Sequence, residues 1–216
     1  MVSERTILCF GDSNTHGAIP LTSLAVRRRH PREVRWPGRL DAALGPGFRV
    51  IEEGHPGRTT VHDDPVEGAH KNGLAVLPAL LESHRPIDLV VVMLGTNDLK
   101  ARYAATPMDV ALSVERIALA VRASPAGPEG AAPALLLVAP VPILEAGCLA
   151  EIFAGGAEKS RALAPRLRDV ADRLGCPFVD AGRVASVDPL DGVHLGAEAH
   201  AAIADAVLDG VRAALA

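Results

Sequence analysis

The sequence predicts an α/β protein in which helices cover both faces of a mostly parallel, five-stranded sheet. Short apolar runs alternate with longer segments of helical periodicity, as in chains built from strand–helix–strand units. The runs "IDLVVVML" at 87–94 and "ALLLVAP" at 134–140 are almost wholly apolar, which is typical of strands covered on both faces. With 216 residues, of which 49% are hydrophobic and 22% charged, the chain is expected to form a single domain over residues 1–216.

Five segments are predicted as strands: 5–10, 48–53, 87–94, 134–140 and 176–181. Because these strands alternate with helices, right-handed crossovers are expected, which gives a flavodoxin-like three-layer α/β/α sandwich. Cys9 lies inside the first strand and is expected to be a small buried hydrophobe.

Five segments are predicted as helices: the stretch from Trp36 to the residue before Gly45, then 73–84, 106–123, 156–175 and 196–216. Thr106 and Pro107 are a cap and a first helical residue for the third of these. Pro165 predicts a kink or an interrupted start in the fourth. Trp36, the single tryptophan, is expected to pack in the core.

Three long connections have little periodicity: 18–35, 57–72 and 139–157. Connections of this length in a compact domain are typically functional or lie at a subunit contact. The third contains four apolar residues that are predicted to be exposed: Ile143, Leu144, Ile152 and Phe153. Such residues could contact either another subunit or the alcohol part of a substrate.

Charge and composition exclude several classes of protein. A net charge of −4 and a pI near 6.1 argue against a nucleic-acid surface. The basic run "VRRRHPR" at 26–32 is interpreted as a solvated loop, or as a salt-bridged one at a subunit contact. No stretch approaches a membrane span, and the apolar run near the N-terminus is too short for a signal-peptide core.

Cysteines and acidic residues give no pattern typical of a metal site. Cys9, Cys148 and Cys176 match neither a disulfide framework nor a zinc site, so a cytoplasmic location is expected. The segment "HDDP" at 62–65, with His70, offers ligand types for a metal, but a loop of solvated charges is the favoured interpretation. No metal and no cofactor are therefore expected.

Polar clusters supported by glycine follow four of the predicted strands: Gly11-Asp12-Ser13, "GHPGRTT" at 54–60, "GTND" at 95–98 and "DPLDGVH" at 188–194. Since sites in open α/β sheets form at the carboxyl ends of the strands, these clusters are expected to meet at one edge. Each cluster alone is weak evidence, because Ser13 could simply cap a helix, Asn97 could be a turn residue and His194 could lie in a surface loop.

The residue types suit nucleophilic catalysis. A serine hydroxyl needs a base to remove its proton, histidine is the usual base, and a carboxylate orients the imidazole. Asp191 and His194 are three residues apart, and Gly192 between them favours a tight turn. Ser13, Asp191 and His194 are therefore the predicted triad, with Asp188 as the rival acid. The Gly-x-Ser-x-Gly elbow is absent, which disfavours the α/β-hydrolase fold.

The clusters together resemble the SGNH hydrolases, the GDSL-type esterases. That family is marked by four blocks, which stand here as Gly11-Asp12-Ser13-Asn14, Gly57, Gly95-Thr96-Asn97-Asp98, and Asp191-Gly192-Val193-His194. Asn14 replaces the leucine of the family name, which leaves the nucleophile unchanged. The stretches "ILCFGDS", "VIEEG", "RTT" and "MLGTND" look especially like the bacterial arylesterase and acyltransferase branch.

The resemblance implies a serine esterase for small, acetyl-like esters, with water or an alcohol as the acyl acceptor, and a homo-oligomer. The tetrahedral intermediate of acyl transfer needs donors for its oxyanion, and these are assigned to the backbone N–H of Ser13 and Gly57 and the side-chain amide of Asn97. Gly54 is the competing glycine for the second donor. Asp12 and Asp98 are expected mainly to bond nearby backbone.

Further residues are candidates for substrate contact: Asp12, His16, His55 and Ile19. His16 and His55 follow the nucleophile and oxyanion blocks, and Ile19 with Pro20 could form a wall for the acyl group.

Rival functions remain open. Within the same fold these are a carbohydrate O-deacetylase and an acyl-thioester hydrolase, the former disfavoured by only 3% aromatic residues. A non-catalytic module that binds an anion at a helix N-terminus is the rival from another class. It lacks a lysine-bearing phosphate loop and leaves the Asn97 and His194 blocks unexplained.

Overall fold

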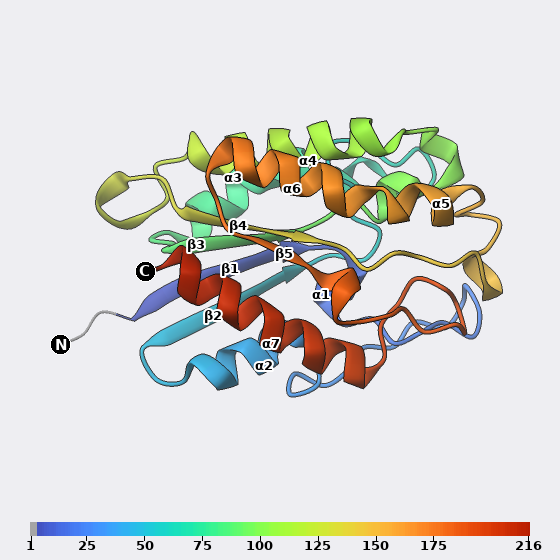
Figure 1. The fold of residues 1–216 in the computed structure, drawn as a ribbon, viewed down its shortest axis with the longest axis horizontal. Helices are drawn as coiled ribbons and strands as arrows, with labels where there is room; N and C mark the ends of the chain where they lie inside the picture. Colours follow the sequence, from blue (N-terminus) through green and yellow to red (C-terminus); the bar gives the residue numbers. More distant parts are fainter. Residues whose placement is uncertain (1–3) are drawn as a thin grey trace.

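A computed structural model describes residues 4–216 and contains the predicted five-stranded sheet (Figure 1). The strands are β1 (Arg5–Gly11), β2 (Phe48–Gly54), β3 (Leu89–Met93), β4 (Ala134–Ala139) and β5 (Phe178–Asp180). All four strand pairs are parallel, and the order across the sheet is β2-β1-β3-β4-β5. The predicted α/β fold is thereby confirmed, and the carboxyl ends of all five strands lie at one edge.

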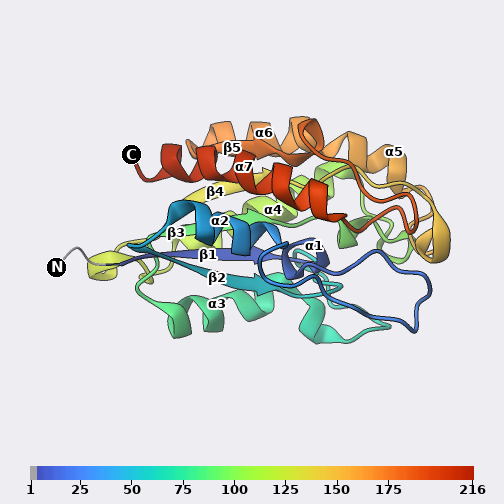
Figure 2. The same ribbon diagram turned by 90° about the horizontal axis from the view of Figure 1, so that it is seen from below.

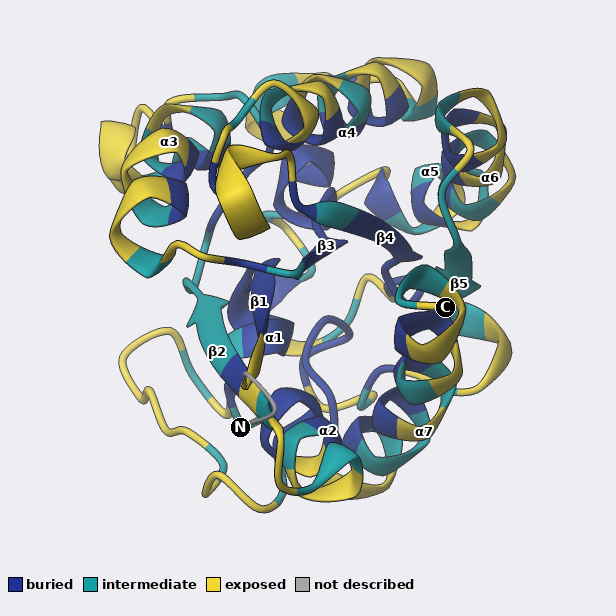
Figure 3. Cartoon of the chain, turned by 90° about the vertical axis from the view of Figure 1, so that its left-hand side faces the viewer, coloured by how far each residue is buried: buried dark blue, intermediate teal, exposed yellow. Residues whose placement is uncertain are grey.

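Helices cover both faces of the sheet: α1 (Ser13–His16), α2 (Trp36–Leu44), α3 (Gly73–His84), α4 (Pro107–Arg122), α5 (Gly156–Arg161), α6 (Leu163–Leu174) and α7 (Ala197–Ala214). Figures 1 and 2 show α2 and α7 on one face, with α3, α4 and α6 on the other. Figure 3 shows that these helices turn their buried sides toward the strands.

Two apolar clusters, one on each face, form the core. Along β1, Leu8 and Phe10 join the cluster under α3, α4 and α6, whereas Ile7 and Cys9 join the cluster under α2 and α7. This alternation follows from the two-residue period of a strand, and it explains why the central strands need apolar side chains at every position. Trp36 and Cys9 are fully buried, as the sequence predicts.

Two helix predictions depend on proline and are confirmed. Thr106 and Asp109 form a reciprocal capping box, and Pro107 is the first residue of α4. The predicted helix over 156–175 is interrupted at Ala162, which separates α5 from α6. Pro165 is the third residue of α6, where the backbone N–H has no partner within the helix and its loss is tolerated.

The segment 139–157 differs from its prediction. Ile143 and Phe153 are only 1% and 2% exposed, so the expectation that they lie on the surface is wrong, whereas Leu144 is 44% exposed. The segment folds back over the cluster beside α4 and α6, where Gly156 lets Ile143 approach closely. An irregular segment has no periodicity from which its buried side can be inferred, so its apolar residues looked exposed.

Within residues 4–216, no helix combines the length and the apolar character needed to cross a bilayer.

Candidate active site

A sharp turn at the end of β1 carries Ser13. Asp12 caps α1, because one of its carboxylate oxygens accepts a hydrogen bond of 2.9 Å from the backbone N–H of Asn14. A Cβ on Gly11 would lie 2.0 Å from the Thr15 hydroxyl, so only glycine permits α1 to begin this close to the strand. Ser13 is thus both a helix-start residue and a residue at the carboxyl edge of the sheet.

The loop before α7 pairs Asp191 with His194. Oδ2 of Asp191 lies 2.6 Å from His194 Nδ1 and accepts a second hydrogen bond, also 2.6 Å, from the backbone N–H of Leu21. Its Oδ1 accepts from the backbone N–H groups of Val193 and His194, both at 2.9 Å. Burial would raise the pKa of Asp191, but the bonds and charge of His194 and the bond from Leu21 lower it to about 2.

Asp188, the rival acid, lies in the same loop with a different role. Its carboxylate accepts from the backbone N–H of Leu190 at 2.9 Å, and its own N–H donates to the His194 carbonyl at 2.8 Å. It therefore shapes the loop, whereas Asp191 is the carboxylate in contact with the imidazole. Asn14 Nδ2 donates to the Val193 carbonyl at 3.1 Å and so joins this loop to the turn that carries Ser13.

Asn97 follows β3, and its side chain is oriented by Arg58 in the segment after β2. Its Nδ2 donates to the carbonyl of Arg58 at 3.0 Å, which identifies the nitrogen and leaves a second N–H for another acceptor. The neighbouring Asp98 is fully buried and accepts from the N–H and hydroxyl of Thr60, the latter at 2.5 Å. Asp98 thus ties the segment after β3 to the segment after β2.

Gly57 and Gly54 occupy different places. A Cβ on Gly54 would lie 2.1 Å from the backbone N of His16, so Gly54 lets α1 pack against the end of β2. Gly57 has a φ of +80°, which favours glycine, and it lies in the wall of a cavity. Of the two, Gly57 is the glycine that lines this cavity.

That cavity has a volume of about 400 Å³ and brings the predicted residues together. Its wall contains Ser13, Gly57, Asn97 and His194. Apolar side chains also line it: Leu21, Leu24, Leu149, Ile152, Phe153 and Val193. Charged side chains lie at the same cavity: Arg27, Glu67, Lys71 and Lys100.

A family model described as the GDSL-like Lipase/Acylhydrolase family matches residues 9–202. The chain belongs to this family. It matches no curated protein sequence. A solved structure of the M. smegmatis aryl esterase is 40% identical, with a TM-score of 0.93 over 98% of this chain and 100% of that one. Est24, a carbohydrate acetylesterase from Sinorhizobium meliloti, is 40% identical, with a TM-score of 0.92 over 97% of this chain and 99% of that one.

The resemblance to SGNH hydrolases is thereby confirmed, and the protein is a carboxylic ester hydrolase of the GDSL-like family. A member of the lipolytic G-D-S-L family from Veillonella parvula is only 17% identical, with a TM-score of 0.64 over 95% of this chain and 97% of that one, and shares the fold.

The remaining predicted residues of this esterase are more scattered. His55 lines the main cavity, and His16 lines a smaller cavity that adjoins it. Ile19 lines neither, since its backbone pairs with Arg28 and Leu21 takes the place at the wall. Asp12 also lines neither, being buried beneath α1, where burial raises its pKa to about 6. The geometry gives no support for substrate contact by Ile19 or Asp12.

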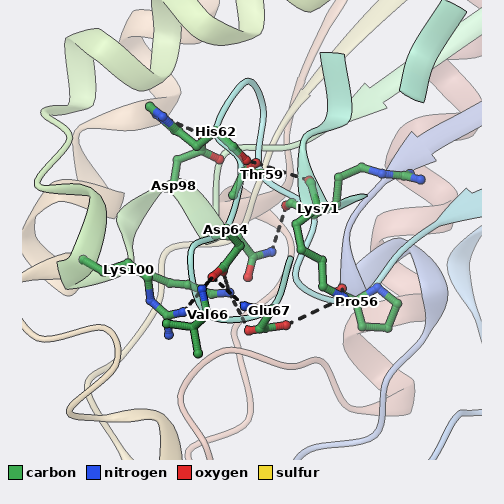
Figure 4. A network of polar contacts seen from close by, with 12 residues as sticks. Pro56, Thr59, His62, Asp64, Val66, Glu67, Lys71, Asp98 and Lys100 are labelled. Atoms are coloured by element: carbon green, nitrogen blue, oxygen red, sulfur yellow. Dashed lines mark hydrogen bonds and ion pairs between the residues drawn. The ribbon is translucent and has the colours of Figure 1, made fainter. Parts of the chain in front are cut away.

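A buried ionic network lies beside the cavity (Figure 4), and the sequence pattern did not predict it. The Asp64 carboxylate is buried and lies 3.2 Å from Lys100 Nζ and 2.9 Å from Arg102, so the interpretation of 62–65 as solvated charges is wrong for Asp64. Burial would raise the pKa of Asp64, but hydrogen bonds from the N–H groups of Glu67 and Val66, with the charge of Lys100, hold it well below its usual value. Among residues 4–216 no cluster of side chains suits a metal ion.

One sequence signal could have identified this network. The chain has three lysines, and two of them, Lys71 and Lys100, lie in the polar segments after β2 and β3. The sequence pattern assigns Arg58 no role of its own, yet its buried guanidinium donates to the carbonyls of Gly11 and Glu53 and lies 4.4 Å from the Phe10 ring centroid. It joins the ends of β1 and β2 beneath the cavity.

Proposed function

We propose that Ser13 is the nucleophile of this esterase, that His194 is its general base and acid, and that Asp191 orients His194. The observation that carries this proposal is the contact of 2.6 Å between Asp191 and His194 at the wall of the cavity that Ser13 also lines. Asp191 bonds Nδ1, which leaves Nε2 of the neutral ring as the atom that accepts a proton.

Acylation begins when the Ser13 hydroxyl attacks the ester carbonyl and its proton passes to His194 Nε2. A bond forms between Oγ and the carbonyl carbon, and the carbonyl oxygen becomes an oxyanion. Collapse of this intermediate breaks the bond to the alcohol oxygen, which leaves with the proton from His194. The ionised Asp191 stabilises the imidazolium in the interval.

Three donors are proposed for the oxyanion: the N–H of Ser13, the N–H of Gly57 and Nδ2 of Asn97. All three residues lie at the same cavity, and Asn97 is held by its bond to the Arg58 carbonyl. Donors fixed before the reaction stabilise the developing charge without reorganisation, and removal of one typically lowers kcat by about 10²–10³-fold.

Water then attacks the acyl-enzyme with His194 as base, and the bond to Ser13 Oγ breaks as Oγ recovers a proton. An alcohol in place of water would yield a new ester, and the apolar side chains of Leu149, Ile152 and Phe153 at the cavity support partial exclusion of water from the acyl-enzyme. We include this acyl transfer in the proposal as a second outcome of the same acyl-enzyme.

The substrate is proposed to be a small, acetyl-like ester, because the cavity measures about 400 Å³. A carbohydrate O-acetyl ester is the second candidate, supported by the likeness to Est24. Phe153 is the one Phe, Tyr or Trp residue among the lining side chains, which offers little surface for stacking on a sugar and favours the first candidate. An acyl thioester would be attacked by the same residues.

No metal is needed for these steps, and a homo-oligomer in the cytoplasm remains part of the proposal. Cys9, Cys148 and Cys176 are all unpaired, which supports a reducing compartment.

Turnover of p-nitrophenyl acetate by the wild type and by Ser13→Ala, without added metal, tests the proposal. We expect the variant to lose almost all activity while its thermal unfolding is unchanged. Equal rates in both proteins would exclude Ser13 as nucleophile, and no turnover in either would favour the anion-binding module.

A further inference from the structure

Lys71 contacts the peptide group that carries the proposed Gly57 donor. Its Nζ donates to the Pro56 carbonyl at 2.8 Å (Figure 4). The Pro56 carbonyl and the Gly57 N–H are the two ends of one planar peptide unit. This unit is trans, since the one cis peptide within residues 4–216 joins Arg85 and Pro86. A cation on its oxygen therefore fixes the direction of its N–H, which points the opposite way.

The charge on Lys71 also strengthens that N–H as a donor. A cation bound to an amide oxygen draws electron density from the nitrogen, and hydrogen bonds polarise one another in a medium of low dielectric. The Lys71 side chain is only 11% exposed, so water screens its charge weakly. The nearby carboxylate of Glu67 is 3.7 Å from Nζ and is shared with Lys100, which it approaches to 3.0 Å.

The surroundings hold Lys71 in this position. Its Nζ lies 3.2 Å from His55 Nε2, and its backbone bonds Thr59 and Gly68. Burial, followed by the charges of Lys71 and Arg58, lowers the pKa of His55 to about 4. His55 is therefore neutral near pH 7, and its Nε2 accepts a hydrogen bond from the ammonium.

We infer that Lys71 is a positioning residue that orients and charges the Gly57 N–H as an oxyanion donor. The inference rests on the proposed function, because it assumes an oxyanion at Gly57. The Ser13 N–H shares its peptide unit with the Asp12 carbonyl. That carbonyl accepts a hydrogen bond from the uncharged backbone N–H of His16 at 2.9 Å. The two backbone donors thus differ in strength, and the one at Gly57 depends on a side-chain charge.

Lys71→Met removes the charge but keeps most of the chain, Lys71→Arg keeps the charge, and Lys159→Met on α5 is the matched control. With p-nitrophenyl acetate, we expect Lys71→Met to lower kcat about tenfold with little change in KM, which is less than the loss of a whole donor. Lys71→Arg should recover most of kcat, and Lys159→Met should match the wild type. Thermal unfolding of all four proteins checks that each is folded.

The pH profile separates a charge effect from a packing effect. Burial lowers the pKa of Lys71, and Glu67 opposes that shift. The charged and titratable groups that face the ammonium are Glu67, His55, Lys100 and Arg27. As pH rises and Lys71 loses its proton, wild-type kcat should fall; Lys71→Arg should retain kcat to higher pH, because guanidinium stays charged.

Equal kcat for Lys71→Met and the wild type, or equal losses in Lys71→Met and Lys71→Arg, would overturn the inference. If Lys71→Met does not fold, the alkaline limb of the wild type beside that of Lys71→Arg decides the question. An inactive Ser13→Ala with an unaffected Lys71→Met would refute this role alone, whereas an active Ser13→Ala would refute the proposed function itself.

A second, independent observation concerns the smaller cavity, whose volume is about 140 Å³. It shares four residues with the main cavity, Leu21, Arg27, Pro56 and His194, but Ser13 and the other proposed donors do not line it. Arg28 and Arg29 complete a cationic wall. Arg29 is paired with Glu52 at 3.1 Å, whereas among residues 4–216 neither Arg27 nor Arg28 forms an ion pair.

The direction of proton transfer indicates what enters this cavity. His194 protonates the alcohol oxygen, so the alcohol part of the ester lies on the His194 side of the reacting carbon. We also propose that the smaller cavity binds an anionic group, such as a carboxylate, on the alcohol part of the substrate. This proposal rests on the role of His194 in the proposed function.

Hydrolysis of 4-acetoxybenzoate and its neutral methyl ester tests the proposal in the wild type, Arg27→Gln/Arg28→Gln and the distant control Arg212→Gln. The ratio of kcat/KM for the anionic over the neutral ester should fall about tenfold in the double variant, since each exposed charge contributes on the order of threefold. Salt should lower the ratio in the wild type. An unchanged ratio would overturn this proposal, whereas failure to hydrolyse either ester would count against the proposed function.

Discussion

The turn that carries Ser13 and the segment that carries Gly57 face the same cavity, but different interactions hold them. The turn is held by local backbone geometry, in which Asp12 caps α1 and Gly11 permits the close approach of Thr15. The segment after β2 is irregular, and buried charges from distant parts of the chain hold it. One half of the proposed oxyanion site is therefore local in sequence, and the other half depends on tertiary ion pairs.

The His194 loop follows the first pattern and gives the largest expected effect. Asp191→Asn should lower kcat by about 10⁴-fold, because an amide favours the wrong imidazole tautomer. Asp188→Asn, in the same loop, should stay close to the wild type, since Asp188 bonds the backbone N–H of Leu190. Steady-state kinetics with p-nitrophenyl acetate measures both. If Asp188→Asn were the more damaging change, the assignment of the acid would be reversed.

The ionic segment should respond through stability. Asp64→Asn leaves Lys100 buried with only Glu67 as its anionic partner, which should lower the free energy of unfolding by about 3–5 kcal/mol. Asp63→Asn is the neighbouring control, because Asp63 is exposed and its change should cost under about 0.5 kcal/mol. Urea denaturation compares the two, and equal midpoints would show that the network does not hold the segment.

Asp12 gives a test by pH. Burial raises its pKa to about 6, so the folded protein holds a proton that the unfolded chain releases near the ordinary aspartate pKa of 3.8. The raised pKa adds about 2–3 kcal/mol to the free energy of unfolding below pH 3.8. This contribution is lost as the pH rises through about 6. Relative to the wild type, Asp12→Asn should therefore gain stability between pH 4 and pH 7. A difference that does not vary with pH would contradict this.

The smallest effect should come from the link between the turn and the His194 loop. Asn14→Ala removes the bond to the Val193 carbonyl, which should cost about 1 kcal/mol of stability. A fall in kcat with no change in KM would add that this bond aligns Ser13 with His194. Thermal unfolding together with kinetics measures both quantities, and no change in either would show that the two elements are held independently.

The difference between the two regions also explains what sequence reasoning could reach. The cap at Thr106 and the break near Pro165 depend on neighbouring residues and were predicted correctly, and each strand was placed to within about two residues at either end. The pairing of Asp191 with His194 depends on a spacing of three residues and a glycine turn, which are also local.

Burial within irregular segments could not be predicted in this way. Asp64 looks like a solvated acid until Lys100 and Arg102, 36 and 38 residues away, are placed beside it. Phe153 looks exposed until its segment folds over the apolar cluster beside α4 and α6. Both outcomes depend on contacts between segments that are distant in sequence.

Labelling with a serine-directed fluorophosphonate tests the central claim most directly. The reagent should abolish turnover of p-nitrophenyl acetate as it attaches, and peptide mapping should place one label per chain on Ser13. Ser13→Ala should remain unlabelled and inactive. A label on another residue, or full inactivation with Ser13 unmodified, would contradict the assignment of Ser13 as the nucleophile.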